Sequence, residues 1–223
     1  MHDKNPFCFN QSILDFDIYL EEIVISHDQG TISLFETTYP MLYHDPLISE
    51  HTMKWVRTFI INYTICPFAK GPVNKGALRI ITSDTLKKHQ ALKDLITEIQ
   101  FLEANPAVET TLLIFARAFK DFFSYLDFIS LAEQLMQNLN YEGIYQLATF
   151  HPDYYFADTS PDDVANYTNR SPYPMIHLLR EDSLDKAIAA YGDTHTIPEK
   201  NIATMNELGL EKMKRLLASI SIP

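Results

Sequence analysis

The stretch Thr110–Ala116, "TTLLIFA", decides the fold class, because it is a short run of apolar and β-branched residues between two long helical patterns. Its length and composition predict a buried strand. Two similar runs flank it along the chain, Ala77–Thr82 ("ALRIIT") and Ile144–Phe150 ("IYQLATF"). The helices predicted between these strands span 85–105 and 122–139. Such a β-α-β-α-β order predicts an α/β domain with a mainly parallel sheet that helices cover.

Further elements complete the predicted domain. The segment 50–65 has apolar residues at helical spacing, and Ser49 is placed to cap that helix. Residues 174–181, "PMIHLLRE", predict a fourth strand, and C-terminal helices follow it. Near the N-terminus, "EEIVIS" and "TISLFE" flank a glycine-bearing turn, which predicts a hairpin. We therefore expect an N-terminal hairpin or arm at 1–48 and a single α/β domain at 49–223.

The composition excludes several classes of protein. The formal net charge of -11 argues against a broad nucleic-acid surface, because phosphate binding needs clustered positive charge. Cys8 and Cys66 are the two cysteines, so neither a disulfide framework nor a zinc ribbon is expected. The histidines lack metal-ligand spacing, and we expect no metal and no cofactor. No signal peptide and no apolar run of about 18 residues is present, so we expect a cytoplasmic protein without membrane contact.

A long polar segment, His151–Glu181 ("HPDYYFADTSPDDVANYTNRSPYPMIHLLRE"), follows the third predicted strand. Ligands of open α/β sheets bind beyond the carboxyl ends of parallel strands, and long ordered loops are usually functional. Its side chains Asn166, Asn169 and Arg170 could hold polar or anionic groups. The alternative is that Arg170 pairs with an acid of the loop and only locks it.

Two basic or titratable residues lie on the fourth predicted strand. Strand alternation places His177 and Arg180 on opposite faces, which argues against their acting as a pair. A lone histidine among apolar neighbours is more often a hydrogen-bonded core residue than an acid–base group. Both interpretations of His177 stay open from the sequence alone.

A second cluster, "CPFAKGPVNKGALR", contains a thiol followed by basic residues with no acid between them. The charges of Lys70, Lys75 and Arg79 would lower the pKa of Cys66 and favour a nucleophile. The carboxyl end of the preceding predicted helix would instead raise that pKa, and a buried, unreactive cysteine is the commoner case.

Three stretches carry a resemblance to a known family: "CPFAKGPVNKGALR", "FHPDYYFADTSPDDVANYTNRSPYPMIHLLRE" and "IPEKNIATMNELG". On these motifs the chain resembles an uncharacterised bacterial family, also seen in plants, that is catalogued as a domain of unknown function. The resemblance runs from Trp55 to Gly209 and leaves 1–48 outside. Where the family has a His-Pro-His-like stretch, this chain has Phe115-Ala116-Arg117. The resemblance implies neither a reaction nor a cofactor, but its motifs coincide with the two segments described above.

Two functions are consistent with these segments. The first is an enzyme acting on a small anionic or polar metabolite, with His151 or His177 moving protons and Cys66 as the nucleophile. The second is a non-catalytic small-ligand sensor or protein-interaction module, and the sequence allows a homodimer through the N-terminal arm. Under either function, the residues expected to bind the ligand are Lys70, Lys75, Arg79, Asn166, Asn169, Arg170 and Arg180.

Overall fold

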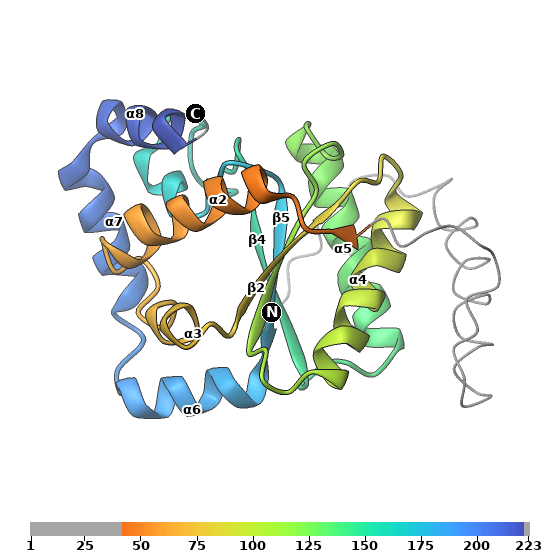
Figure 1. Ribbon diagram of the computed structural model, residues 1–223. Helices are drawn as coiled ribbons and strands as arrows, with labels where there is room; N and C mark the ends of the chain where they lie inside the picture. The colour runs from red at the N-terminus through yellow and green to blue at the C-terminus, as the bar shows by residue number, and fades with distance from the viewer. Residues whose placement is uncertain (1–41, 221–223) are drawn as a thin grey trace, which may run out of the picture. The chain divides into compact units, whose positions relative to one another are not determined.

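A computed structural model describes residues 42–220 as a mixed α/β fold. A five-stranded sheet forms its centre, with the strands in the order β1-β2-β3-β5-β4 (Figure 1). The strands are β1 (Leu42–Tyr43), β2 (Leu78–Ser83), β3 (Thr110–Ile114), β4 (Tyr145–Phe150) and β5 (Met175–Arg180). The predicted α/β class is therefore confirmed. The hairpin predicted within 1–48 lies outside the described residues.

The prediction of a mainly parallel sheet is wrong. β2 and β3 pair in parallel, but β5 lies between β3 and β4 and is antiparallel to both, and β1 is antiparallel to β2. The strands β2, β3 and β4 still run in one direction, as the β-α-β-α-β order requires. The physical reason for the difference is the link between β4 and β5. A parallel neighbour needs a crossover that returns the chain along the sheet, whereas residues 151–174 include only a short 3-10 helix, η2 (Val164–Thr168), and lead straight into the opposite direction.

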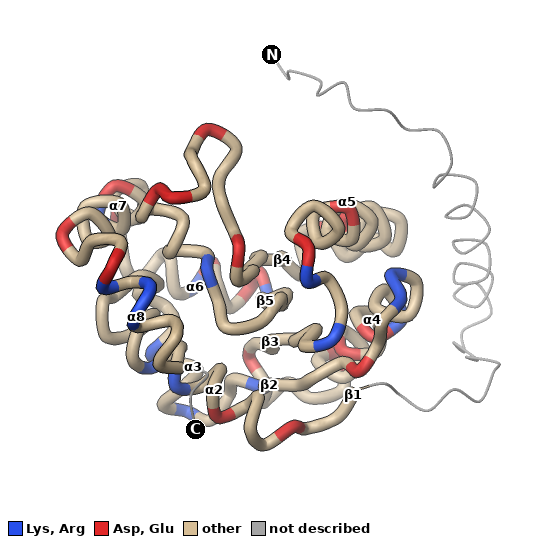
Figure 2. Tube along the Cα trace, turned by 90° about the horizontal axis from the view of Figure 1, so that it is seen from above, with Lys and Arg blue, Asp and Glu red and all other residues tan. Residues whose placement is uncertain are grey.

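Helices cover both faces of the sheet (Figures 1 and 2). One face carries α4 (Lys88–Ala104) and α5 (Phe122–Asn138), which lie together on one side of the strands in Figure 2. The opposite side carries the remaining described helices. They are α2 (Pro46–Trp55) with its π-helical continuation η1 (Val56–Ile61), α3 (Lys70–Lys75), α6 (Glu181–Tyr191), α7 (Ile197–Leu208) and α8 (Leu210–Ile220).

The first described helix begins earlier than the sequence predicts. Asp45, not Ser49, caps α2: its Oδ1 accepts hydrogen bonds from the backbone N–H groups of Leu47 and Ile48, both at 3.0 Å. Pro46 occupies the first turn, where its missing N–H costs nothing. The side-chain oxygen of Asp45 thus satisfies two of the donors that a helix start leaves unpaired.

The core between the sheet and α2 is built from large apolar side chains. Trp55 and Phe59 are almost fully buried, and they belong to one cluster with Leu112 of β3 and Met175 of β5. Met205 brings α7 into the same cluster. These contacts hold the π-helical turn close to one end of the sheet. Within residues 42–220, no helix is both long and apolar enough to cross a lipid bilayer.

Candidate functional site

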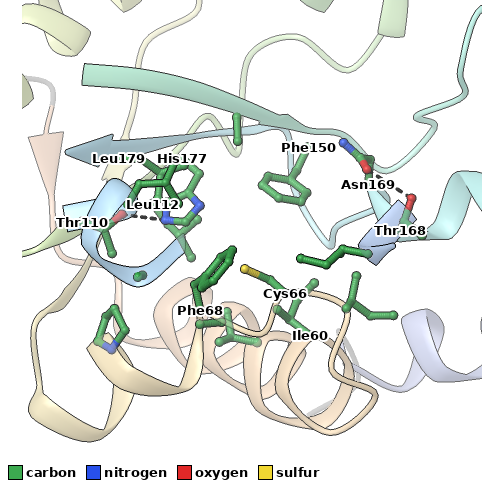
Figure 3. Close-up of a pocket in the computed structure, with 18 of the residues that line it drawn as sticks. Ile60, Cys66, Phe68, Thr110, Leu112, Phe150, Thr168, Asn169, His177 and Leu179 are labelled. Atoms are coloured by element: carbon green, nitrogen blue, oxygen red, sulfur yellow. Dashed lines mark hydrogen bonds between the residues drawn. The ribbon is translucent and has the colours of Figure 1, made fainter. Parts of the chain in front are cut away.

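A cavity of about 940 Å³ lies between the sheet and the helices of the α2 side (Figure 3). Each of β2, β3, β4 and β5 contributes residues to its wall, as do α2, α3, α6 and α7. Most of these side chains are apolar. The largest of them are Trp55, Phe68, Phe150 and Phe156. A cavity of this size and character is typical of a site for a small molecule.

Both segments that the sequence singled out reach this cavity. Cys66 comes from the turn after η1, and Phe156, Thr168 and Asn169 come from the long segment between β4 and β5. Figure 3 shows Cys66 and Asn169 on different sides of the same hollow, with Phe68 projecting between the walls. The fold thus brings together two stretches that are far apart along the chain.

His177 is the titratable side chain nearest the centre of the sheet in this wall. It lies on β5, where its backbone pairs with Leu112 of β3 and Ala148 of β4. Its Nε2 is 2.6 Å from the Thr110 hydroxyl oxygen, and that oxygen is 2.5 Å from the carbonyl of Leu178. Burial lowers the pKa of His177 to about 4, so the imidazole is neutral at pH 7.

Cys66 lines the cavity as a free thiol. Burial raises its pKa, and the backbone N–H groups of Phe68 and Ala69 oppose this effect only in part. The thiol is therefore protonated at neutral pH, and the protonated form is a poor nucleophile. The lowered pKa that would support nucleophilic catalysis is not what this environment produces.

The basic residues of the first segment do not gather inside the cavity. Lys75 lies at the rim, where its Nζ is 2.9 Å from Glu109 Oε1 and its side chain is 67% exposed. Lys70 is exposed and outside the wall. Arg79 faces α4 on the other side of the sheet, with its Nε 2.7 Å from Glu98 Oε1. The three cations therefore occupy three different environments.

Arg180 borders the cavity, but its guanidinium group is directed to the α4 side, where each of its three nitrogens donates one hydrogen bond. Nε donates to the carbonyl of Val108 at 3.1 Å and Nη1 donates to the Tyr145 hydroxyl at 3.0 Å. Nη2 donates to the carbonyl of Leu102. This arrangement agrees with strand alternation, which places the side chains of Arg180 and His177 on opposite faces of β5.

Arg170 locks the long segment rather than facing the cavity. Its Nε donates to the carbonyl of Tyr154 at 3.0 Å, and Nη2 donates to the carbonyl of Pro161 at 2.7 Å. The guanidinium plane lies over the ring of Tyr167, 4.6 Å from its centroid. The sequence allowed Arg170 to lock the loop by pairing with one of its acids. In the structure Arg170 does hold the loop, but its partners are backbone carbonyls.

Asn166 has a similar internal role. It is fully buried, and its Oδ1 accepts from the backbone N–H of Phe156 at 3.1 Å and from the Thr159 hydroxyl at 2.7 Å. Its Nδ2 donates to the carbonyl of Ser160 at 2.8 Å. These three bonds satisfy a stretch of loop backbone that would otherwise be unpaired.

His151 lies outside the cavity wall, whereas Asn169 is part of it. His151 is 0% exposed and outside the cavity wall: Nε2 donates to the carbonyl of Phe119 at 2.8 Å, and Nδ1 accepts from the N–H of Asp153 at 3.0 Å. Burial lowers its pKa, and no ring nitrogen is left for proton transfer. Asn169 lines the cavity, but its Nδ2 donates a hydrogen bond to the carbonyl of Thr149 at 3.2 Å.

Sequence reasoning missed Thr110 and Trp55. Thr110 was the first residue of a predicted strand, and nothing in the sequence showed that it would lie beside His177 on a neighbouring strand. Trp55 supplies a large part of the apolar wall, and its indole N–H is buried without a hydrogen-bond partner. Within the described part of the chain, no group of three or more His, Cys, Asp or Glu side chains could hold a metal ion.

The fold and the cavity define a mixed α/β domain with a mainly apolar pocket beside a central antiparallel strand. The chain belongs to the family described as "Protein of unknown function (DUF1415)", which matches residues 47–215. The family resemblance inferred from the sequence motifs is therefore confirmed. Comparison with curated proteins and with solved structures gave no match.

Proposed function

We propose that this protein binds a small, largely apolar molecule in the cavity, with His177 as its polar anchor, and that it acts by binding rather than by catalysis. The observation that carries the proposal is the cavity itself. It measures about 940 Å³, its wall is mainly aromatic and aliphatic, and four strands and four α-helices of the described fold contribute to it. Burial of apolar surface is the main source of affinity in such a pocket.

The chemistry of the wall supports binding more than catalysis. With a pKa of about 4, His177 is a weak base at pH 7, and general-base catalysis works best with a pKa near the working pH. The pKa of Cys66 is raised, so a thiolate nucleophile is disfavoured. The expected enzyme acting on an anionic metabolite has less support for these two reasons. The non-catalytic small-ligand interpretation has more.

The charge distribution also favours an uncharged ligand body. The lysines of the wall are Lys75 and Lys186, and both side chains are exposed at its outer part. Lys75 is already paired with Glu109. A charged group on the ligand would therefore be placed at the rim, where water reaches it, while the body of the ligand occupies the apolar interior.

A titration with neutral fluorescent probes tests the proposal. N-phenyl-1-naphthylamine and 2-naphthol should bind saturably with one site per chain, because each is apolar and carries a single hydrogen-bond donor. Ala148, whose backbone pairs with His177, lines the cavity, so Ala148→Trp should weaken probe binding at least ten-fold. Ala189→Trp is the matched control, because Ala189 is exposed on α6 and outside the wall.

Circular dichroism and thermal unfolding establish that both variants are folded before they are compared. If neither probe binds the wild-type chain saturably, the proposed function is wrong. If both probes bind equally well to Ala148→Trp and to the control, the binding site is elsewhere, and the proposal fails in that case too.

A further inference from the structure

We propose that Thr110 sets the tautomer of His177 and thereby selects ligands that donate a hydrogen bond, such as neutral phenols, alcohols and N–H heterocycles, over ligands that only accept one. This inference rests on the proposed function, because it names the chemical class of molecule that the same cavity takes.

The hydroxyl of Thr110 has a single hydrogen to donate. Its oxygen lies 2.5 Å from the carbonyl oxygen of Leu178 and 2.6 Å from Nε2 of His177. A carbonyl oxygen can only accept, so the hydroxyl must donate its hydrogen to Leu178. The contact with His177 can then be a hydrogen bond only if the imidazole donates Nε2–H to the hydroxyl oxygen. The geometry thus assigns the proton of the neutral ring to Nε2.

The other ring nitrogen of His177, Nδ1, is then left without a proton. A neutral imidazole with its proton on Nε2 has a lone pair on Nδ1. Among the described residues, no side chain or backbone group hydrogen-bonds to Nδ1 of His177. This atom is not among the buried polar atoms that lack a partner, so it is accessible from the cavity, and Figure 3 shows it on the side of the ring turned away from Thr110.

Two neighbouring polar side chains of the wall, Asn169 and Arg180, have partners of their own, whereas the unpaired indole N–H of Trp55 is buried. Asn169 donates to the carbonyl of Thr149, and its Oδ1 lies 3.2 Å from the Thr168 hydroxyl, which is nearer to the carbonyl of Ala165 at 2.9 Å. The guanidinium group of Arg180 has three acceptors on the α4 side. Nδ1 of His177 is therefore an unused acceptor set in a mainly apolar wall, and it gains a hydrogen bond from a ligand that brings a donor.

The same geometry disfavours an anion next to His177. A carboxylate would bring its own lone pairs against the lone pair of Nδ1, and it would lose its hydration in the apolar interior. The lysines of the wall, Lys75 and Lys186, are exposed at the rim, and the guanidinium of Arg180 is already bonded to three other acceptors, so none of them compensates for this loss at His177. The sequence predicts a small anionic or polar ligand. Of these two kinds, the cavity favours an uncharged molecule that carries a hydrogen-bond donor.

The experiment compares three probes of one shape. 2-Naphthol donates a hydrogen bond, 2-methoxynaphthalene only accepts one, and 2-naphthoate is an anion at pH 7. The wild-type chain should bind 2-naphthol at least ten-fold more tightly than either of the others. Thr110→Val, which keeps the shape and removes the hydroxyl, frees the imidazole to carry its proton on Nδ1, so the preference for 2-naphthol over 2-methoxynaphthalene should fall to three-fold or less.

Thr110→Ser is the matched control, because it keeps the hydroxyl and should keep the preference. Nitrogen-15 NMR of the imidazole provides a readout that does not depend on binding: the wild type and Thr110→Ser should show a protonated Nε2 and an unprotonated Nδ1 at His177. A protonated Nδ1 in the wild type would overturn the inference. Equal affinity for 2-naphthol and 2-methoxynaphthalene would also overturn it while leaving the proposed function intact, whereas absence of binding by every naphthalene probe refutes the proposed function itself.

Discussion

The low pKa of His177 predicts a specific loss of stability in acid. Burial lowers this pKa from the ordinary value of 6.5 to about 4. In the unfolded chain the imidazole takes up a proton below about pH 6.5, whereas in the folded chain it stays neutral until about pH 4. The unfolded state therefore binds more protons between these two values, and the free energy of unfolding falls as the pH falls through this window. From the two pKa values, the loss between pH 7 and pH 5 is about 2 kcal/mol.

The assay is urea unfolding at pH 7 and at pH 5, for the wild type and for His177→Phe. The aromatic ring of phenylalanine keeps much of the packing and cannot titrate, so the difference in free energy of unfolding between the two proteins isolates His177. The lowered pKa of His151 contributes to acid sensitivity in both proteins and cancels in that difference. The charged groups around the cavity, Lys75, Glu109, Arg180 and Lys186, are also common to both.

The expected result is that the stability advantage of the wild type over His177→Phe is about 2 kcal/mol smaller at pH 5 than at pH 7. If the difference between the two proteins is the same at both pH values, His177 titrates normally in the folded chain. It would then be charged or readily protonated near neutral pH, and the assignment of a neutral acceptor facing the cavity would be refuted.

Three further predictions concern Arg79, Asn166 and Gly76, all outside the cavity wall. Arg79→Met leaves the buried Glu98 carboxylate without its cation, so unfolding in urea at pH 7 should show a loss of about 3 kcal/mol that shrinks at lower pH, because burial already raises the pKa of Glu98; a loss that does not change with pH would contradict this. Asn166→Ala removes three buried hydrogen bonds and should cost about 3 kcal/mol in thermal unfolding, whereas no loss would show that the loop does not depend on them. Gly76→Ala should cost about 1 kcal/mol, because Gly76 has φ 68° in open space, while Gly71→Ala should cost nothing; equal effects of the two would exclude backbone strain as the cause.

Much of the fold follows from local patterns in the sequence. Each predicted strand from 77 to 150 is present with small shifts at its ends, and the long helices between them are α4 and α5. These elements are predictable because an apolar strand or an amphipathic helix is encoded in neighbouring residues. The common direction of β2, β3 and β4 follows as well, since a helix between two strands returns the chain to the same starting edge.

The position of β5 could not be read in the same way. An apolar strand buried in the middle of a sheet has the same composition whether it runs parallel or antiparallel to its neighbours. Its place between β3 and β4 is decided by pairing with residues distant in sequence, such as Thr110 with Leu179 and Tyr145 with Arg180. The absence of a full crossover helix between 151 and 174 was the available signal for an antiparallel partner.

The candidate site, like the fold, was determined partly by the sequence and partly by the tertiary structure. The sequence by itself determined which residues carry polar chemistry, and Cys66, Asn169 and His177 do line the cavity. Only the tertiary structure decided that Arg170 and His151 form their hydrogen bonds with backbone groups. The physical reason is that a buried polar group must find a partner, and the sequence does not say which residue supplies it.

The contact between Thr110 and His177 shows this limit most clearly. The two residues are 67 positions apart, on strands whose pairing no local pattern encodes. Each side chain alone gave an ambiguous signal in the sequence, a strand threonine and a core-like histidine. Their chemistry as a pair arises because the sheet places a hydroxyl with one hydrogen between a carbonyl and an imidazole, and that geometry exists only in the folded chain.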